Sequence, residues 1–414
     1  MSTPAERPPA EAGPRVALRL IGSRRFGPYF FGNALSASGT WFQNLASALL
    51  VYRLTHSAFL LGLLNFCNFI PILVLAPWAG AAADRFDRRR VVVVTQVLST
   101  ALSAALAAVA WAGLADQWVV IGCAVGLGIG SAFSAPASTA LVAQLVEPRD
   151  LPSAVALNSM TFNIARAAGP ALAALSVKTL GIPASFAINA GSYLVFVVAL
   201  WFTRPRAQRT ATREEARLRE SFRLLRAQPR LALYLLIVTA VGFASDPVNT
   251  EAPAFAHAFG RADTLAGPLI GFFGAGAVAA AFLLAGRVAG SRRRMAVTLS
   301  LLGFGIVGFS VAPWLPVAFA LLVIAGFGYL ASNTSATSRL QLEVEDTHRG
   351  RVMALWSVAF LGLRPFASIV DGALAGAFGV RIAGVCLAIP ALAGAAVVTV
   401  MARKRLHSAT IASQ

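Results

Sequence analysis

The sequence is poor in charged side chains. Only 13% of its 414 residues are Asp, Glu, Lys or Arg, about half of the roughly 25% that a soluble domain carries. Apolar residues make up 57% of the chain, and the mean hydropathy is +0.71. The composition therefore excludes an ordinary soluble protein and predicts a protein that crosses a membrane many times.

Acidic residues are scarcer still, with 17 against 35 basic residues and a net charge of +18. In a soluble chain this excess would suggest binding to nucleic acid. Here the arginines lie in short segments between apolar runs instead of forming one patch, so no nucleic acid partner is predicted. Orientation in a membrane explains the excess better.

Several chemical signatures are missing. The three cysteines and four histidines are too widely spaced for a metal site or a catalytic triad, and no Gly-x-x-x-x-Gly-Lys-Ser/Thr loop is present. Residues 1–25 contain no apolar core of a signal peptide. The sequence therefore predicts no enzyme, no ATP-driven pump, no cofactor and no metal.

Apolar runs long enough to span a bilayer, about 20 residues each, recur twelve times. They lie at about 28–52, 58–82, 91–113, 117–145, 153–177, 182–203, 231–255, 265–286, 295–313, 316–338, 352–378 and 382–402. The predicted fold is an all-α polytopic membrane protein with twelve transmembrane helices.

The basic residues alternate between the two ends of these runs. With twelve spans, 29 of the 35 Lys and Arg lie on the side that also holds both termini. Four lie on the other side and two inside spans. Because cytoplasmic loops carry the excess of Lys and Arg, both termini are predicted to be cytoplasmic.

The two halves of the chain repeat each other. A shift of 198 residues without gaps aligns Gly128 and Gly130 with Gly326 and Gly328, and Arg166 with Arg364. We therefore predict six-helix bundles at 26–203 and 231–403, with a substrate site between them. The remaining segments are predicted to be cytoplasmic: a tail at 1–25, a basic linker with nine arginines at 204–230 that lies along the lipid surface, and a tail at 404–414.

A short charged stretch, residues 80–90, joins the second and third runs. Its pattern Gly-x-x-x-Asp-Arg-x-x-Arg-Arg resembles the loop between the second and third helices of the major facilitator superfamily of transporters. The resemblance implies a gate in which Asp84 is held against residues 347–352 and Arg88 is its partner. Gly80 and Arg85 belong to the same gating motif.

Further segments resemble one branch of that superfamily, which includes the enterobactin exporter and the macrolide efflux proteins of bacteria. They are Trp41, residues 51–57, Pro71, residues 84–90 and residues 349–352. The resemblance implies a monomeric transporter in the bacterial cytoplasmic membrane that exports a small amphipathic molecule, a drug or a siderophore, coupled to proton influx. The alternatives are an importer of the same fold, or a membrane receptor or scaffold without turnover.

Gly169 and Pro170 resemble part of the Gly-x-x-x-Gly-Pro-x-x-Gly motif of exporters in this superfamily. Alanines replace the other glycines, and small residues of either kind allow helices to approach closely. Gly169 and Pro170 are therefore predicted to serve helix packing.

Ionisable residues inside spans are candidates for function, because an unpaired charge there is costly. Asp246 precedes Pro247, which breaks its helix, and is the preferred proton carrier. Glu251 and Asp371 lie near the outer boundary, where coupling and a water-exposed capping or gate role are equally open. Arg166 and Arg364 lie near mid-membrane, where they face the substrate or pair structurally at the interface between the halves.

Polar residues in the first two spans are candidates to line a substrate cavity. In the first span they are Asn33, Trp41, Gln43 and Asn44, and the second adds Asn65 and Asn68. The alternative is that they form hydrogen bonds between helices.

Overall fold

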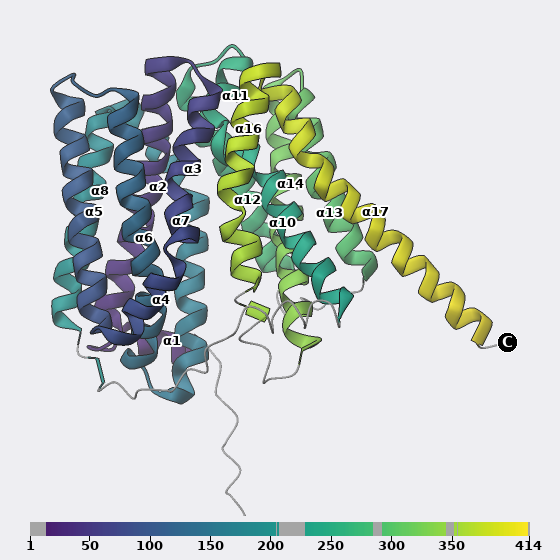
Figure 1. The fold of residues 1–414 in the computed structure, drawn as a ribbon, viewed down its shortest axis with the longest axis horizontal. Helices are drawn as coiled ribbons and strands as arrows, with labels where there is room; N and C mark the ends of the chain where they lie inside the picture. Colours follow the sequence, from purple (N-terminus) through teal and green to yellow (C-terminus); the bar gives the residue numbers. More distant parts are fainter. Residues whose placement is uncertain are drawn as a thin grey trace, which may run out of the picture.

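The computed structural model describes residues 14–203, 205–206, 228–284, 292–344, 352–353 and 355–412. Within these ranges the side chains of 14–15, 162–164, 166–168, 170–171, 292 and 402–412 are not described. The described residues form helices and short connections, with no strand among them. Two helical bundles stand side by side, the N-terminal one purple to teal and the C-terminal one teal to yellow (Figure 1).

The N-terminal bundle contains eight α-helices and one 3₁₀ turn in the described residues. They are α1 (Pro14–Ile21), α2 (Gly27–Thr55), α3 (Ala58–Val74), α4 (Ala76–Arg85), α5 (Arg88–Trp111), α6 (Gln117–Leu145), η1 (Pro148–Asp150), α7 (Leu151–Leu180) and α8 (Ile182–Phe202).

The C-terminal bundle also consists of long helices, and more of them are interrupted. Its described elements are α10 (Pro229–Thr250), α11 (Ala252–Ala258), η2 (Asp263–Leu265), α12 (Ala266–Leu283), α13 (Arg292–Val311), α14 (Leu315–Leu342), a π-helical turn η3 (Val358–Gly362), α16 (Arg364–Phe378) and α17 (Val380–Ala412).

Each of the twelve predicted spans is occupied by a helix or a broken helix. Within the described residues, nine helices are long and apolar enough to cross a membrane, and the bent pair α3 and α4 makes a tenth. The other two, α2 and α7, are 29 and 30 residues long but more polar. These two helices supply many of the polar groups that sequence reasoning assigned to a cavity.

The second predicted span, 58–82, is broken. Helices α3 and α4 meet at an angle of 53° around Leu75. Pro77, in the first turn of α4, has no N–H to donate and its ring would clash with the carbonyl four residues earlier, so the helix bends here. As a result α4 packs on α5 and α6 of its own bundle, whereas α3 packs along α16 of the other.

The internal repeat is visible in the packing of its glycines. A Cβ on Gly128 would lie 2.3 Å from the carbonyl oxygen of Asn68 on α3, and one on Gly326 would lie 1.8 Å from that of Phe273 on α12. Gly130 and Gly328 face α5 and α13 in the same way. In both bundles the fourth span therefore approaches the second and third through equivalent glycines.

Residues 1–25 contain a packed helix that the sequence did not predict. Val16 and Leu20 of α1 are buried against the N-terminal bundle, and Arg19 forms an ion pair with Asp150 at 2.7 Å. At the other end of the chain, α17 continues through residues 404–412 and extends away from the C-terminal bundle (Figure 1). Most of the basic linker, residues 204 and 207–227, lies outside the described residues.

The two halves meet along α3 and α16. We call the end at which α2 stops and α3 begins the outer end, following the charge pattern. There Gly62 of α3 crosses Gly372 of α16 so closely that a Cβ on Gly62 would lie 2.8 Å from the Cα of Gly372 and 2.4 Å from the carbonyl oxygen of Ser368. Helix α7 packs on α12 as the second contact between the halves.

Candidate functional site

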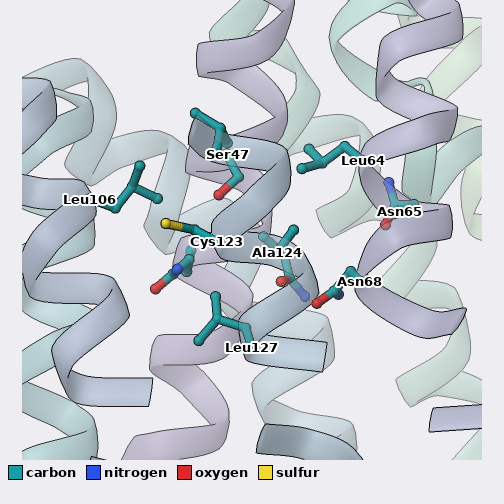
Figure 2. A pocket seen from close by; sticks show the side chains of 11 residues that line it. Ser47, Leu64, Asn65, Asn68, Leu106, Cys123, Ala124 and Leu127 are labelled. Carbon is teal, nitrogen blue, oxygen red and sulfur yellow. The ribbon is translucent and has the colours of Figure 1, made fainter. Parts of the chain in front are cut away.

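A small polar cavity lies inside the N-terminal bundle, between α2, α3, α5 and α6. Figure 2 shows Asn65 and Asn68 on one side of it and Leu106 with Cys123 on the other. No charged residue lines it among the described residues. Its polar lining consists of side chains that donate and accept hydrogen bonds without a formal charge: Gln43, Asn44, Ser47, Asn65 and Asn68.

A second cavity lies between the two halves and adjoins the first. Asn44 and Asn65 line both. Trp41 and Phe69 complete the N-terminal side, and the C-terminal side includes Asn249, Pro253 and Arg364. The guanidinium carbon of Arg364 stands 4.7 Å from the centre of the Phe69 ring, so this arginine reaches across the interface.

Six of the eight residues predicted to line a substrate cavity lie around these two cavities: Trp41, Gln43, Asn44, Asn65, Asn68 and Arg364. Gln43 also connects helices, because its Oε1 accepts hydrogen bonds from Ser103 Oγ and Asn189 Nδ2, both at 2.6 Å. Its buried Nε2 has no hydrogen-bond partner in the part of the chain that the structure describes. Both the cavity role and the interhelical role are therefore filled by one side chain.

The other two candidates differ. Asn33 donates to Asn158 Oδ1 on α7 at 2.8 Å, which is a helix-to-helix bond away from both cavities. The side chains of Arg166 and Pro170 lie outside the described residues, although both positions are in α7. Gly169 lies close to α2, since a Cβ there would lie 2.6 Å from the Cβ of Trp41.

A π-helical turn sets the position of Arg364. The amide of Leu363 bonds to the carbonyl of Val358, five residues back, and α16 begins at the next residue. Pro365 cannot donate a backbone hydrogen bond, which explains why the regular ladder ends here. Thr239 on α10 donates to the carbonyl of Ala359 within the turn at 3.0 Å. Turns of this kind occur often at functional sites.

Asp246 is held by partners that sequence reasoning did not identify. Its Oδ2 accepts a hydrogen bond from Thr250 Oγ1 at 2.9 Å, and its Oδ1 accepts one from Ser368 Oγ at 3.0 Å. Arg364 is close enough for electrostatic attraction. Thr250 lies one helical turn after Asp246, and Ser368 lies one turn after Arg364. These spacings do not by themselves show that Ser368 contacts Asp246, because that contact depends on the packing of α10 against α16.

Glu251 and Asp371 are fully buried, each with a relative exposure of 0%. In this conformation both side chains are therefore shielded from water, and the choice between coupling and a capping or gate role stays a prediction. Glu251 occupies the break between α10 and α11, and residues 252–256 of α11, which follow it in the chain, are buried as well. Neither carboxyl group has a hydrogen-bond partner within the described ranges. The two are near enough to interact electrostatically with each other and with Asp246.

The gating motif lies at the opposite, inner end of the N-terminal bundle. Asp87 caps α5 by accepting a hydrogen bond from the amide of Arg90 at 2.7 Å. The Arg88 side chain donates to the carbonyls of Ala83 and Ala140, both at 3.4 Å. Asp84 and Arg85 are exposed.

Two predictions about this motif stay open in the structure. A Cβ on Gly80 would have no described atom within 4 Å, so its role in the gate is not expressed as a close contact in this conformation. The segment predicted to receive Asp84, residues 347–352, lies outside the described residues except for Val352.

We expect Asp84→Asn to reduce the transport rate without weakening substrate binding, because Asp84 lies far from both cavities. Loss of a gate contact worth about 1.4 kcal/mol would change the ratio of the two end states tenfold. Initial rates and substrate affinity should be measured at matched expression. Asp87→Asn is the matched control, since it loses the same charge but asparagine caps a helix equally well. Equal rates for Asp84→Asn and wild type would rule out the gate.

Comparison with known proteins identifies a family. The family model described as transmembrane secretion effector matches residues 23–414. The staphyloferrin A transporter of Staphylococcus aureus is 26% identical over 366 residues, covering 85% of this chain and 90% of that protein. The multidrug efflux pump Tap of Mycobacterium tuberculosis is 26% identical over 388 residues, covering 88% and 91%.

Solved structures of low sequence identity share the fold. A bacterial homologue of the human lysosomal transporter Spinster, in an inward-facing and unoccupied conformation, superposes with a TM-score of 0.74 at 16% identity. The superposition covers 96% of this chain and 99% of that one. The D-xylose–proton symporter gives a TM-score of 0.69 at 15% identity, covering 88% and 97%.

Proposed function

Because the chain belongs to the transmembrane secretion effector family of the major facilitator superfamily, we propose that it exports a small amphipathic molecule in exchange for protons. The substrate class is a drug or a siderophore, which is supported by relatives described as siderophore, multidrug and macrolide transporters. The protein is a multi-pass membrane transporter and not an enzyme. We place it in the bacterial cytoplasmic membrane as a monomer, with both termini in the cytoplasm and the inner surface in contact with anionic lipid.

The buried carboxyl groups of α10 and α16 are the observation that carries the proposal. A carboxylate without a hydrogen-bond donor is costly to bury, and two that repel each other are more costly still. Glu251 and Asp371 meet both conditions. We assign them as the pair that holds the transported proton, and Asp246 as the anion that faces Arg364.

The two cavities supply the substrate side of the exchange. Their lining combines an uncharged amide surface with the aromatic faces of Trp41 and Phe69 and a single arginine among the described residues. In this conformation the cavities measure only about 20 and 30 Å³, room for about one water molecule each, so we expect the two halves to separate before an amphipathic molecule binds between these amide and aromatic groups. Arg364 links both sides, since it lines the cavity and attracts Asp246.

Flux in reconstituted vesicles tests this function. Inside-out proteoliposomes with an acidic lumen should accumulate an exported probe, and a trapped pH-sensitive dye should report proton loss in step with uptake. A difference of two pH units supplies about 2.7 kcal/mol per proton, enough for roughly hundredfold accumulation. The probes would be ethidium, a radiolabelled macrolide and ferric-ion-free siderophores.

The direction of the gradient separates the alternatives. Accumulation driven by a proton flow in the same direction as the probe would show an importer. Saturable binding of a probe without flux under either gradient would favour a receptor or scaffold and contradict the proposal.

A further inference from the structure

Three aromatic side chains form a cluster across the two halves at the outer end. The ring centres of His56 and His257 are 6.2 Å apart, and Tyr52 lies 5.6 Å from the first and 6.2 Å from the second. Tyr52 and His56 belong to the end of α2, whereas His257 is on α11. Both histidines are exposed, so water at this end reaches them directly.

An ion pair beside the cluster also joins the halves. Arg53, next to Tyr52, donates through Nε and Nη2 to both carboxylate oxygens of Asp263, with Nη2–Oδ1 at 3.1 Å. A paired fork of this kind holds two elements in one orientation. The outer end of α2 is therefore attached to the C-terminal half by the ion pair and by the rings.

The backbone of His56 is unusual. It is the only non-glycine residue with a positive φ in the part of the chain that the structure describes, with φ 48° and ψ 26°, and its amide closes α2 by bonding to the carbonyl of Tyr52 at 2.8 Å. Glycine is the usual residue at such a helix end, because it adopts this conformation without strain. Histidine is one of the few non-glycine residues that adopt this conformation repeatedly, so position 56 places an imidazole at the helix end with little strain.

The cluster is connected to the buried carboxyl groups through α11. His257 follows Glu251 by six residues on a short helix, about 9 Å along its axis. Tyr52 is within electrostatic range of Glu251 as well as of Asp263. A motion of α11 as a unit that separates His257 from His56 would therefore also move the backbone at Glu251, the residue at which α11 starts.

We propose that His56 and His257 form a second proton-binding site, between the two halves, whose occupation opens the outer end. Two protonated imidazoles would face each other beside the Arg53–Asp263 pair, and two uncompensated positive charges would then lie where the halves must touch. Separating the halves relieves this repulsion. The site differs from the carboxyl pair in being exposed, in joining α2 to α11, and in requiring no substrate.

Other ionisable residues belong to the same chain segments or to neighbouring elements: Tyr52 and Arg53 on α2, Glu251 at the start of α11, Arg261 and Asp263 between α11 and α12, and Arg381 on α17. Asp263 is occupied by Arg53, and Arg381 bonds to the carbonyls of Ser310 and Ala312. The carboxylate of Asp263 therefore faces Arg53 and not the histidines.

If the proposed proton exchange is correct, the same protons then gain access to Glu251. Opening at the outer end would withdraw α11 and admit outer water to the carboxyl pair. Acid outside would in this way open the transporter and supply it with the driving ion.

The test measures the opening itself, by the distance between two spin labels. Leu114 and Trp314 lie in exposed connections at the outer ends of the two halves. Each would be replaced by a labelled cysteine in a full-length chain from which Cys67, Cys123 and Cys386 have been removed. Double electron–electron resonance spectroscopy in lipid nanodiscs then gives the distribution of distances between the two labels, and from it the open and closed populations without substrate.

Lowering the pH from 8 to 5, the interval in which histidine titrates, should raise the open-to-closed ratio roughly three- to tenfold. The double variant His56→Asn with His257→Gln should lose this increase, because neither replacement can be protonated. Asparagine also tolerates the left-handed backbone at position 56. His407→Gln, at the far end of α17, is the matched control and should retain the increase.

Two outcomes would overturn the proposal. The first is an absence of any pH-dependent opening in the labelled parent protein. The second is an equal increase in the double histidine variant, provided that its closed distance at pH 8 matches that of the parent. The pH-dependent rise in the open-to-closed ratio could also persist in the double histidine variant but disappear in a Glu251→Gln, Asp371→Asn double variant. That result would assign the effect to the carboxyl pair instead. Because no substrate is present, failure of export would not affect this result.

Discussion

Asp371→Asn or Glu251→Gln should abolish gradient-driven export while exchange of substrate without a gradient continues. The reason is that an amide fills the same space as a carboxyl group but carries no exchangeable proton. Removal of one buried carboxyl group leaves the other without the neighbour that repels it. The transporter can then alternate between its two end states without carrying a proton. Accumulation under a two-unit pH gradient should fall from about a hundredfold to near unity.

Asp246→Asn is the informative comparison. Its two hydroxyl donors, Thr250 and Ser368, can still bond to the amide oxygen, but Arg364 loses its negative partner. An unpaired arginine next to the cavity should impair exchange as well as driven export. Asp246→Asn could instead abolish gradient-driven export alone, while Asp371→Asn and Glu251→Gln retain it. The proton carrier would then be Asp246, which is the residue that the sequence analysis preferred.

Gly62→Ala should hold the outer end open and strongly reduce transport. The added Cβ would lie 2.4 Å from the carbonyl oxygen of Ser368 and 2.8 Å from Gly372, so the halves could not close without moving backbone. Overpacking of this kind costs about 1–3 kcal/mol, which would lower the closed-to-open ratio roughly five- to hundredfold. Distances between labels at Leu114 and Trp314 would measure that ratio directly.

Gly191→Ala provides the control for this change. Position 191 is also a glycine in a long helix, α8, but an added Cβ there would have no described atom within 4 Å. Both changes raise helix propensity equally. Closed populations that are the same for Gly62→Ala and Gly191→Ala would show that the glycine crossing does not limit closure of the outer end.

Hydropathy and charge predicted the architecture because the bilayer constrains the backbone. A chain in lipid must satisfy its hydrogen bonds internally, so an apolar run of sufficient length is a helix. Twelve runs therefore gave twelve helical positions, and the glycines that the shift of 198 residues aligns face equivalent helices in the two bundles. The same reading found Trp41, Gln43, Asn44 and Arg364 because polar residues in apolar runs are few and conspicuous.

The breaks in the helices were harder to predict from the sequence. Pro77 and Pro365 are visible in the sequence, yet a proline alone does not say whether a helix bends, widens into a π turn or continues. That outcome depends on what can accept or supply the freed hydrogen bonds, as Thr239 does for Ala359. Position along a span likewise left open whether Glu251 is water-exposed, and the structure shows it fully buried at the break between α10 and α11.

The sequence by itself determined the membrane class, the helices, the repeat and the candidate polar residues, since each depends on local composition or spacing. Only the tertiary structure decided which of these residues meet. Gly62 with Gly372, Asp246 with Ser368 and His56 with His257 are each separated by more than a hundred residues. No periodicity within one helix specifies such pairs, because they depend on how one bundle packs against the other.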